Sequence, residues 1–148
     1  MKYADLIQHR MTDYVFSWEK MLSFQGNTAP YLQNAYVRIR SIFRKAVESG
    51  IVVEHSSISI NVPAERALAL QILQFSEVLH AVMEDQRPNL LCLYLYELAD
   101  HFHRFYEACP ILKSEGELRS SRLALADVTA KVLKTGLGLL GISVPERM

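Results

Sequence analysis

Several features that identify common classes of protein are scarce or missing in this sequence. No apolar run approaches the roughly 18 residues needed to span a bilayer, so we expect no membrane segment. The first ten residues include Asp5, Gln8 and His9 where a signal peptide would need an apolar stretch. The sequence therefore predicts no targeting segment and a cytoplasmic protein.

Cysteine is also scarce, since only Cys92 and Cys109 occur among 148 residues. If both lie on one helix, their separation of 17 residues places them about 25 Å apart. A disulfide requires Cα atoms within about 7 Å. We predict that the two thiols do not pair with each other, as suits a reducing cytoplasm.

Nucleotide-binding motifs are missing. The stretch QGNTAPY has one glycine, no lysine and no preceding strand, whereas a phosphate-binding P-loop needs GxxxxGK[ST] after a strand. Gly136, Gly138 and Gly141 resemble a dinucleotide fingerprint only superficially, because they fall inside or at the end of a predicted helix. Close packing of helices is the better interpretation of these glycines.

Metal-binding and catalytic patterns are missing as well. There is no HExxH and no CxxC. His101 and His103 lie two residues apart, and side chains at that spacing on a helix point to different sides. Asp100 and Glu97 near His101 are better explained as surface ion-pairing groups than as an acid–base pair. We predict no catalytic residue, no metal site and no cofactor in these 148 residues.

The formal charge is zero, but it is unevenly distributed. Residues 1–50 carry a net +3, residues 51–112 carry −5 and residues 113–148 carry +2. A nucleic-acid-binding protein needs a basic face rather than a basic total. Only the two ends of the chain could supply such a face, and an ordinary solvated helix surface explains the same charges.

Apolar residues recur at helical spacing through most of the chain, which predicts an all-α fold. The β-branched stretch 51–62 allows at most a short strand pair, because it lacks a tight-turn dipeptide. Asn27 or Thr28 can cap one helix, and Pro30 fits its first turn. The expected architecture is a helical bundle of four long helices plus short N-terminal helices, with the long helices over residues 27–50, 63–87, 89–109 and 117–140.

The helix that begins near Asn27 has a polar stripe opposite its apolar one. The stripe recurs at steps of three and four, and comprises Tyr31, Asn34, Arg38, Ser41 and Lys45. An aromatic ring, an amide and two cations in line can stack on bases, hydrogen-bond base edges and neutralise phosphates. A solvated helix face is an equally good interpretation of the stripe taken alone.

Three separate blocks of sequence resemble one family. The blocks are DYVFSWEKMLSFQGNTAPYLQNAYVRIRSIFRKA, LLCLYLYELADHFHRFYEACPIL and SRLALADVTAKVLKTGLGLLGISVPERM. Their order and spacing resemble the C-terminal DALR anticodon-binding domain of arginyl-tRNA synthetase over nearly the whole chain, most weakly at residues 48–65. The place of the signature reads Ser121-Arg122-Leu123-Ala124-Leu125, so the signature letters themselves are not intact.

This resemblance implies a function and a division of the chain. The family is a class I ligase that uses ATP to join arginine to its tRNA, with a catalytic domain N-terminal to this region. We therefore expect an entry segment from the catalytic region at 1–26 and the helical domain at 27–148. The expected partners are arginine tRNA, through its anticodon stem-loop, and the catalytic domain of the same parent chain. The fragment alone would bind tRNA without catalysis; the alternative is a helical protein-interaction domain without RNA binding.

The resemblance also implies candidate RNA-binding residues. Those carried over from the family are Tyr31, Arg38, Tyr106 and Met148, and the polar stripe adds Asn34 and Lys45. The family usually has an aromatic residue where this chain has Asn34, so a stacking contact is lost there or replaced by a hydrogen bond. Tyr106 lies near the apolar side of its helix, so a core role competes with an RNA role. The tail beyond Gly141 is either frayed or held down by Ile142 and Val144.

Overall fold

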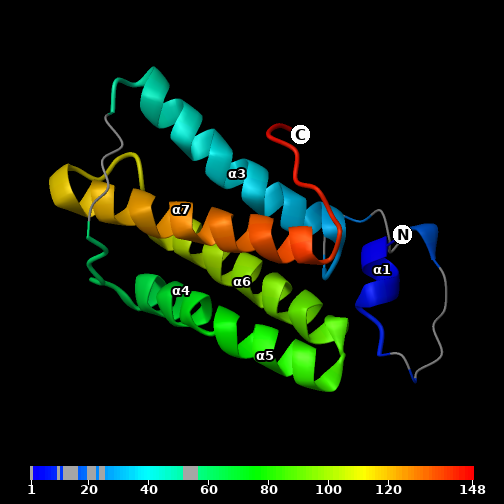
Figure 1. Cartoon of the computed structure of the whole chain (residues 1–148). Coiled ribbons are helices and arrows are strands. Elements are labelled where there is room, and N and C mark those ends of the chain that lie inside the picture. The colour runs from blue at the N-terminus through cyan, green and yellow to red at the C-terminus, as the bar shows by residue number, and fades with distance from the viewer. Residues whose placement is uncertain (1, 10, 12–16, 20–22, 24–25, 52–56) are drawn as a thin grey trace.

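A computed structural model describes the chain except for residues 1, 10, 12–16, 20–22, 24–25 and 52–56. All elements assigned within the described residues are helices, which confirms the predicted all-α class. Figure 1 shows α3, α6, α7 and the pair α4–α5 running side by side, with α1 at one end. The helices are α1 (Lys2–Leu6), α3 (Ala29–Glu48), α4 (Pro63–Leu73), α5 (Phe75–Asp85), α6 (Pro88–Ala108) and α7 (Gly116–Leu139).

Helix α6 is the centre of the bundle and contacts α1, α3, α4, α5 and α7. The buried residues of α6 are Leu91, Cys92, Tyr94, Leu95, Leu98, Ala99, Phe102 and Phe105. Cys92 and Cys109 are both buried free thiols, which confirms that they do not pair.

Gly136 allows α7 to approach α6 closely. A Cβ atom at this position would lie 2.6 Å from Leu95 Cδ2, a distance that real contacts do not show. The helix-packing interpretation is therefore confirmed for Gly136. Gly138 has open space around it, and Gly141 has a φ of +69° at the end of α7. Gly141 N–H bonds to Gly138 O and Ile142 N–H to Leu137 O, which together satisfy the last carbonyl groups of the helix.

The sequence predicted one unbroken helix over residues 63–87. This prediction is wrong in one respect, because the structure divides the segment into α4 and α5 at Gln74. The Tyr94 hydroxyl donates to Gln71 O at 2.9 Å, and Gln74 N–H donates to the same carbonyl oxygen at 3.3 Å across a three-residue turn. A side chain that enters the helical hydrogen-bond ladder in this way bends a helix. Leu70 and Leu73, near the end of α4, are exposed.

Helix α3 begins and ends as its sequence predicted. Thr28 is the N-cap, and its hydroxyl oxygen accepts a bond from Tyr31 N–H at 3.3 Å. The helix ends at Glu48, followed by Gly50 at a φ of +69°. The stretch 51–62 is expected to hold at most a short strand pair. Residues 57–61 form no strand, and residues 52–56 lie outside the described residues.

A buried ion pair connects α4 to α7. Arg122 Nε donates to Glu65 Oε1 at 2.8 Å, and both side chains are almost fully buried. Glu65 Oε2 also accepts the backbone N–H groups of Asn61 and Val62, at 2.7 and 3.2 Å. Arg122 therefore has a structural role at the place where the family signature would stand.

Within the residues that the structure describes, none of the helices is both long enough and apolar enough to cross a bilayer.

Candidate nucleic-acid interface

The polar stripe of α3 lies opposite its buried side, as the periodicity predicted, although Tyr31 at its start also packs against the core. Arg38 and Lys45 are exposed, while Tyr31, Asn34 and Ser41 are half-buried. The opposite side of α3 supplies the core contacts, through Leu32, Ala35, Tyr36, Ile39, Ile42 and Ala46.

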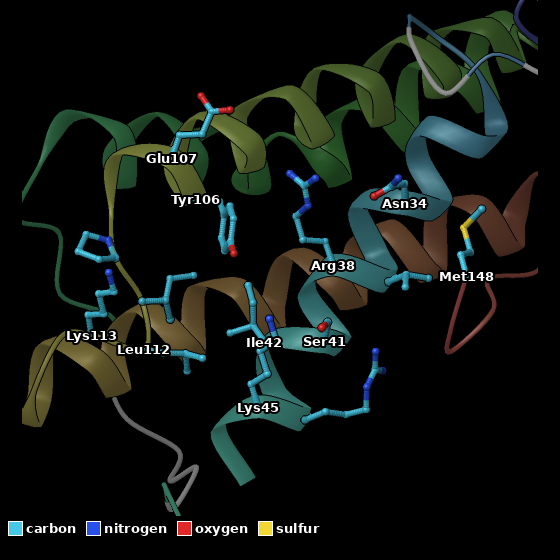
Figure 2. A pocket seen from close by; sticks show the side chains of 14 residues that line it. Asn34, Arg38, Ser41, Ile42, Lys45, Tyr106, Glu107, Leu112, Lys113 and Met148 are labelled. Atoms are coloured by element: carbon cyan, nitrogen blue, oxygen red, sulfur yellow. The ribbon is translucent and has the colours of Figure 1, made fainter. Parts of the chain in front are cut away.

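An open groove of about 680 Å³ lies between this stripe and the end of α6. Figure 2 shows Arg38 and Ser41 on α3 facing Tyr106 on α6 across the groove. The groove brings together residues that are more than 60 positions apart in the sequence. Five of the six predicted site residues line it, namely Asn34, Arg38, Lys45, Tyr106 and Met148.

Tyr106 lies at the surface of the bundle rather than in its core. Its side chain is 39% exposed, and its ring centroid lies 6.1 Å from that of Phe102, a core residue. The Arg38 guanidinium carbon lies 5.6 Å from the Tyr106 ring centroid, within the range of a cation–π contact. The ring is thus supported by the core and available at the groove.

Tyr31, the sixth predicted residue, lies in an adjoining hollow rather than in the groove. Its hydroxyl oxygen is 2.9 Å from His103 Nδ1, and its ring packs edge-on against the imidazole. This hollow shares Asn34, Arg38 and Glu107 with the groove, so the two form one continuous surface.

The side chains of this pair are neutral. Burial lowers the pKa of His103, and the positive charge of Arg38 lowers it further. Burial also raises the pKa of Tyr31, with a further contribution from Asp100. The Tyr31–His103 contact is therefore a hydrogen bond between uncharged groups, suited to holding the Tyr31 ring in place.

Several charged residues of this surface were not predicted. Arg44 adds a cation from α3, Lys113 adds one from the loop after α6, and Arg104 lies in the hollow with Tyr31. Glu107 is a carboxylate at the same surface. Arg44 could have been found from its position one residue before Lys45. Lys113 had no sequence signal, because only the packing of α6 against α3 brings its loop to the groove.

The C-terminal tail turns back along α3 (Figure 1). Gln33 Nε2 donates to Ser143 O at 2.8 Å, and Ile142 and Val144 pack against the core. The expectation that these two apolar residues hold the tail down is confirmed. Met148 is 61% exposed and lines the groove.

The described residues contain no cluster of three or more His, Cys, Asp or Glu side chains that could hold a metal ion. The groove and the hollow together offer cations, aromatic rings, the amide of Asn34 and apolar side chains. Such a set can bind a flexible polyanion that carries flat apolar groups.

Comparison with known proteins identifies the family. The model of the DALR anticodon binding domain matches residues 32–148. The chain belongs to this family. An arginine–tRNA ligase of Chromobacterium violaceum is 57% identical to this chain over 148 residues. The match covers all of this chain and 25% of that protein.

Solved structures agree with the sequence match. Arginyl-tRNA synthetase of Thermus thermophilus superposes with a TM-score of 0.90 at 35% identity, covering 99% of this chain and 26% of that one. The Plasmodium falciparum enzyme gives a TM-score of 0.89 at 38% identity, with the same coverage. The DALR chain thus spans about a quarter of the length of the relatives it matches.

Proposed function

We propose that this chain binds the anticodon stem-loop of an arginine tRNA. The observation that carries the proposal is the groove, which brings residues 34–45, 106 and 148 together on a domain of the DALR family. Sequence-specific RNA recognition commonly targets single-stranded loops, whose unstacked bases can stack on aromatic rings. An anticodon loop is such a ligand.

The groove offers a different group to each part of the RNA. Arg44, Lys45 and Lys113 supply positive charge for phosphates. Tyr106 supplies a ring that can stack on a base, with Arg38 beside it to stack or to hydrogen-bond. Asn34 has an amide at the junction of the groove and the hollow, where it can bond a base edge.

We further propose that the whole protein is an arginine–tRNA ligase that uses ATP and acts in the cytoplasm. The likeness to ligases of this kind supports the proposal. Residues 1–26 would then enter from the catalytic region, and 27–148 would form the anticodon-binding domain. Tyr3 of α1 is buried, and its hydroxyl donates to Cys92 O at 3.0 Å, so part of the entry segment packs on the domain.

A second candidate is a protein-interaction domain. Exposed apolar side chains on α4 and α5 favour it, since Leu70, Leu73 and Met83 are 50%, 73% and 65% exposed. These helices lie on the far side of the bundle from α3 (Figure 1). The catalytic domain of the same parent chain would be one such partner.

Binding of arginine tRNA as a function of salt concentration tests the proposal. Phosphate contacts make log K fall linearly with log salt, by about 0.7 per contact on a single strand. We expect preferential binding of arginine tRNA over a tRNA for another amino acid, with a steep salt dependence. Equal and weak binding of both tRNAs would refute the proposal and favour the protein-interaction domain.

Arg38→Ala sharpens this test. Arg38 is exposed, and its cation–π contact with Tyr106 stabilises the fold by only about 0.5–1 kcal/mol. We expect a loss of binding of about 1–3 kcal/mol for a base contact, or a salt slope lower by about one for a phosphate contact. Arg66→Ala on α4 is the matched control, since it removes the same charge from an exposed position on another helix.

A further inference from the structure

Glu146, two residues before the chain end, is held by three side chains of α3. Tyr36 Oη donates to Glu146 Oε1 at 3.0 Å, and Arg40 Nε donates to Oε2 at 3.2 Å. Arg44 Nη1 donates to the backbone oxygen of Glu146 at 2.9 Å. We call Tyr36, Arg40, Arg44 and Glu146 the tail clamp.

The clamp residues of α3 are spaced four apart, so they form one row along the helix. This row is distinct from the polar stripe that contains Arg38. Tyr36 anchors the row because its ring is buried in the core, with 4% of the residue exposed. An exposed ion pair such as Arg40–Glu146 contributes little by itself. The backbone contact from Arg44 and the packing of Val144 add to it.

The charge of Glu146 is unfavourable for RNA binding. Hydrogen bonds from Tyr36 and Arg40 lower the pKa of Glu146, so it is ionised at neutral pH. A carboxylate beside an RNA-binding groove repels phosphates, and the Glu146 carboxylate also engages the Arg40 cation. Arg44 is engaged by the backbone oxygen of Glu146 instead. Met148, two residues after Glu146, lines the groove.

We propose that the tail clamp is a positioning device for RNA recognition: Glu146 fixes the chain end so that Met148 forms one wall of the groove. Glu146 itself does not contact the RNA. The inference rests on the proposed function, and it assigns Tyr36, Arg40 and Glu146 a role that none would have as an ordinary surface or core residue.

The sign of one substitution separates positioning from charge. Glu146→Ala removes a negative charge near the groove, so electrostatics alone would strengthen tRNA binding. Positioning predicts the reverse, a weakening of about five- to tenfold, the lower end of the range for a lost base contact. Glu48→Ala is the matched control, because Glu48 is an exposed carboxylate on α3 that neither lines the groove nor belongs to the clamp. We expect Glu48→Ala to leave the affinity unchanged or to raise it.

A double substitution tests whether the effect passes through Met148. In a Met148→Ala background, Glu146→Ala should weaken tRNA binding less than twofold, because the effects of two substitutions that act through one contact do not add. Tyr36→Phe keeps the buried ring and removes one donor, so it should give a smaller loss than Glu146→Ala. Unchanged or stronger binding by Glu146→Ala, or an equal loss in both backgrounds, would overturn the inference.

A measurement without RNA keeps this inference separate from the proposed function. The ¹³C-methyl NMR signal of Met148 should be shifted from its random-coil position in the native chain and should move toward it in Glu146→Ala. If the native chain does not prefer arginine tRNA, the proposed function fails, whatever this signal shows. If the signal is at its random-coil position in both chains, the clamp does not position Met148 and the inference fails.

Discussion

Glu65→Ala should be one of the most destabilising single changes in this domain. Glu65 is 1% exposed, and its carboxylate accepts the Arg122 guanidinium together with the N–H groups of Asn61 and Val62. Once Glu65 is truncated, the Arg122 guanidinium loses the partner of its Nε and keeps the bond from its Nη1 to the Ser114 hydroxyl at 2.8 Å. The substitution therefore leaves a buried guanidinium without its counter-charge and removes the acceptor at the start of α4.

The expected cost follows from these contacts. Removing one partner of a buried ion pair costs about 3–5 kcal/mol, out of a total stability of roughly 5–15 kcal/mol for a typical domain. For a chain of this length, each kcal/mol lowers the melting temperature by about 2–4 °C. We therefore expect Glu65→Ala to lower the melting temperature by roughly 6–20 °C.

Urea unfolding followed by circular dichroism measures this loss, and a double variant tests its cause. Glu65→Met with Arg122→Met removes both charges and fills the space with apolar side chains, which is often neutral for a buried pair. The double variant should lose only the contribution of the helix-start contacts, about 1 kcal/mol. If Glu65→Ala costs less than about 1 kcal/mol, or the double variant is as unstable as the single one, the pair is not the cause.

Three further predictions concern pH, helix packing and stacking. Burial would raise the pKa of Glu65, but its backbone donors and Arg122 lower it on balance. The contribution of Glu65 to the free energy of unfolding should thus be complete above the unfolded pKa of about 4.3 and be lost as the pH falls below it. Urea titrations at several pH values should show a steeper loss of stability for the native chain than for Glu65→Gln. Gly136→Ala should lower the free energy of unfolding by about 1–3 kcal/mol, because the new methyl group forces Leu95 to move. Gly138 has open space around it, so Gly138→Ala should instead stabilise α7 by up to about 1 kcal/mol. Thermal unfolding of the two variants measures both effects. Tyr106→Ala should weaken tRNA binding by about 1–3 kcal/mol per stacked base while Tyr106→Phe retains it, and equal affinities of both variants would exclude stacking.

Sequence alone determined the features that depend on neighbours along the chain. The period of apolar residues predicted α3, α6 and α7, because one face of each helix must be buried. Thr28, Gly50 and Gly141 marked helix ends through local hydrogen bonding and backbone conformation. The outward direction of Arg38 and Lys45 followed from the same period, and the order of three sequence blocks indicated the family.

Tertiary structure decided the features that depend on contacts between distant segments. The bend at Gln74 arises where the Tyr94 hydroxyl reaches Gln71 O, 23 residues away in the sequence. Lys113 joins the groove because α6 packs against α3, and the exposed Tyr106 ring lies next to Phe102, a core residue. Glu146 contacts residues more than 100 positions away in the sequence. The helical period could place Arg40 and Arg44 on a helix face, but it could not predict that both bind Glu146.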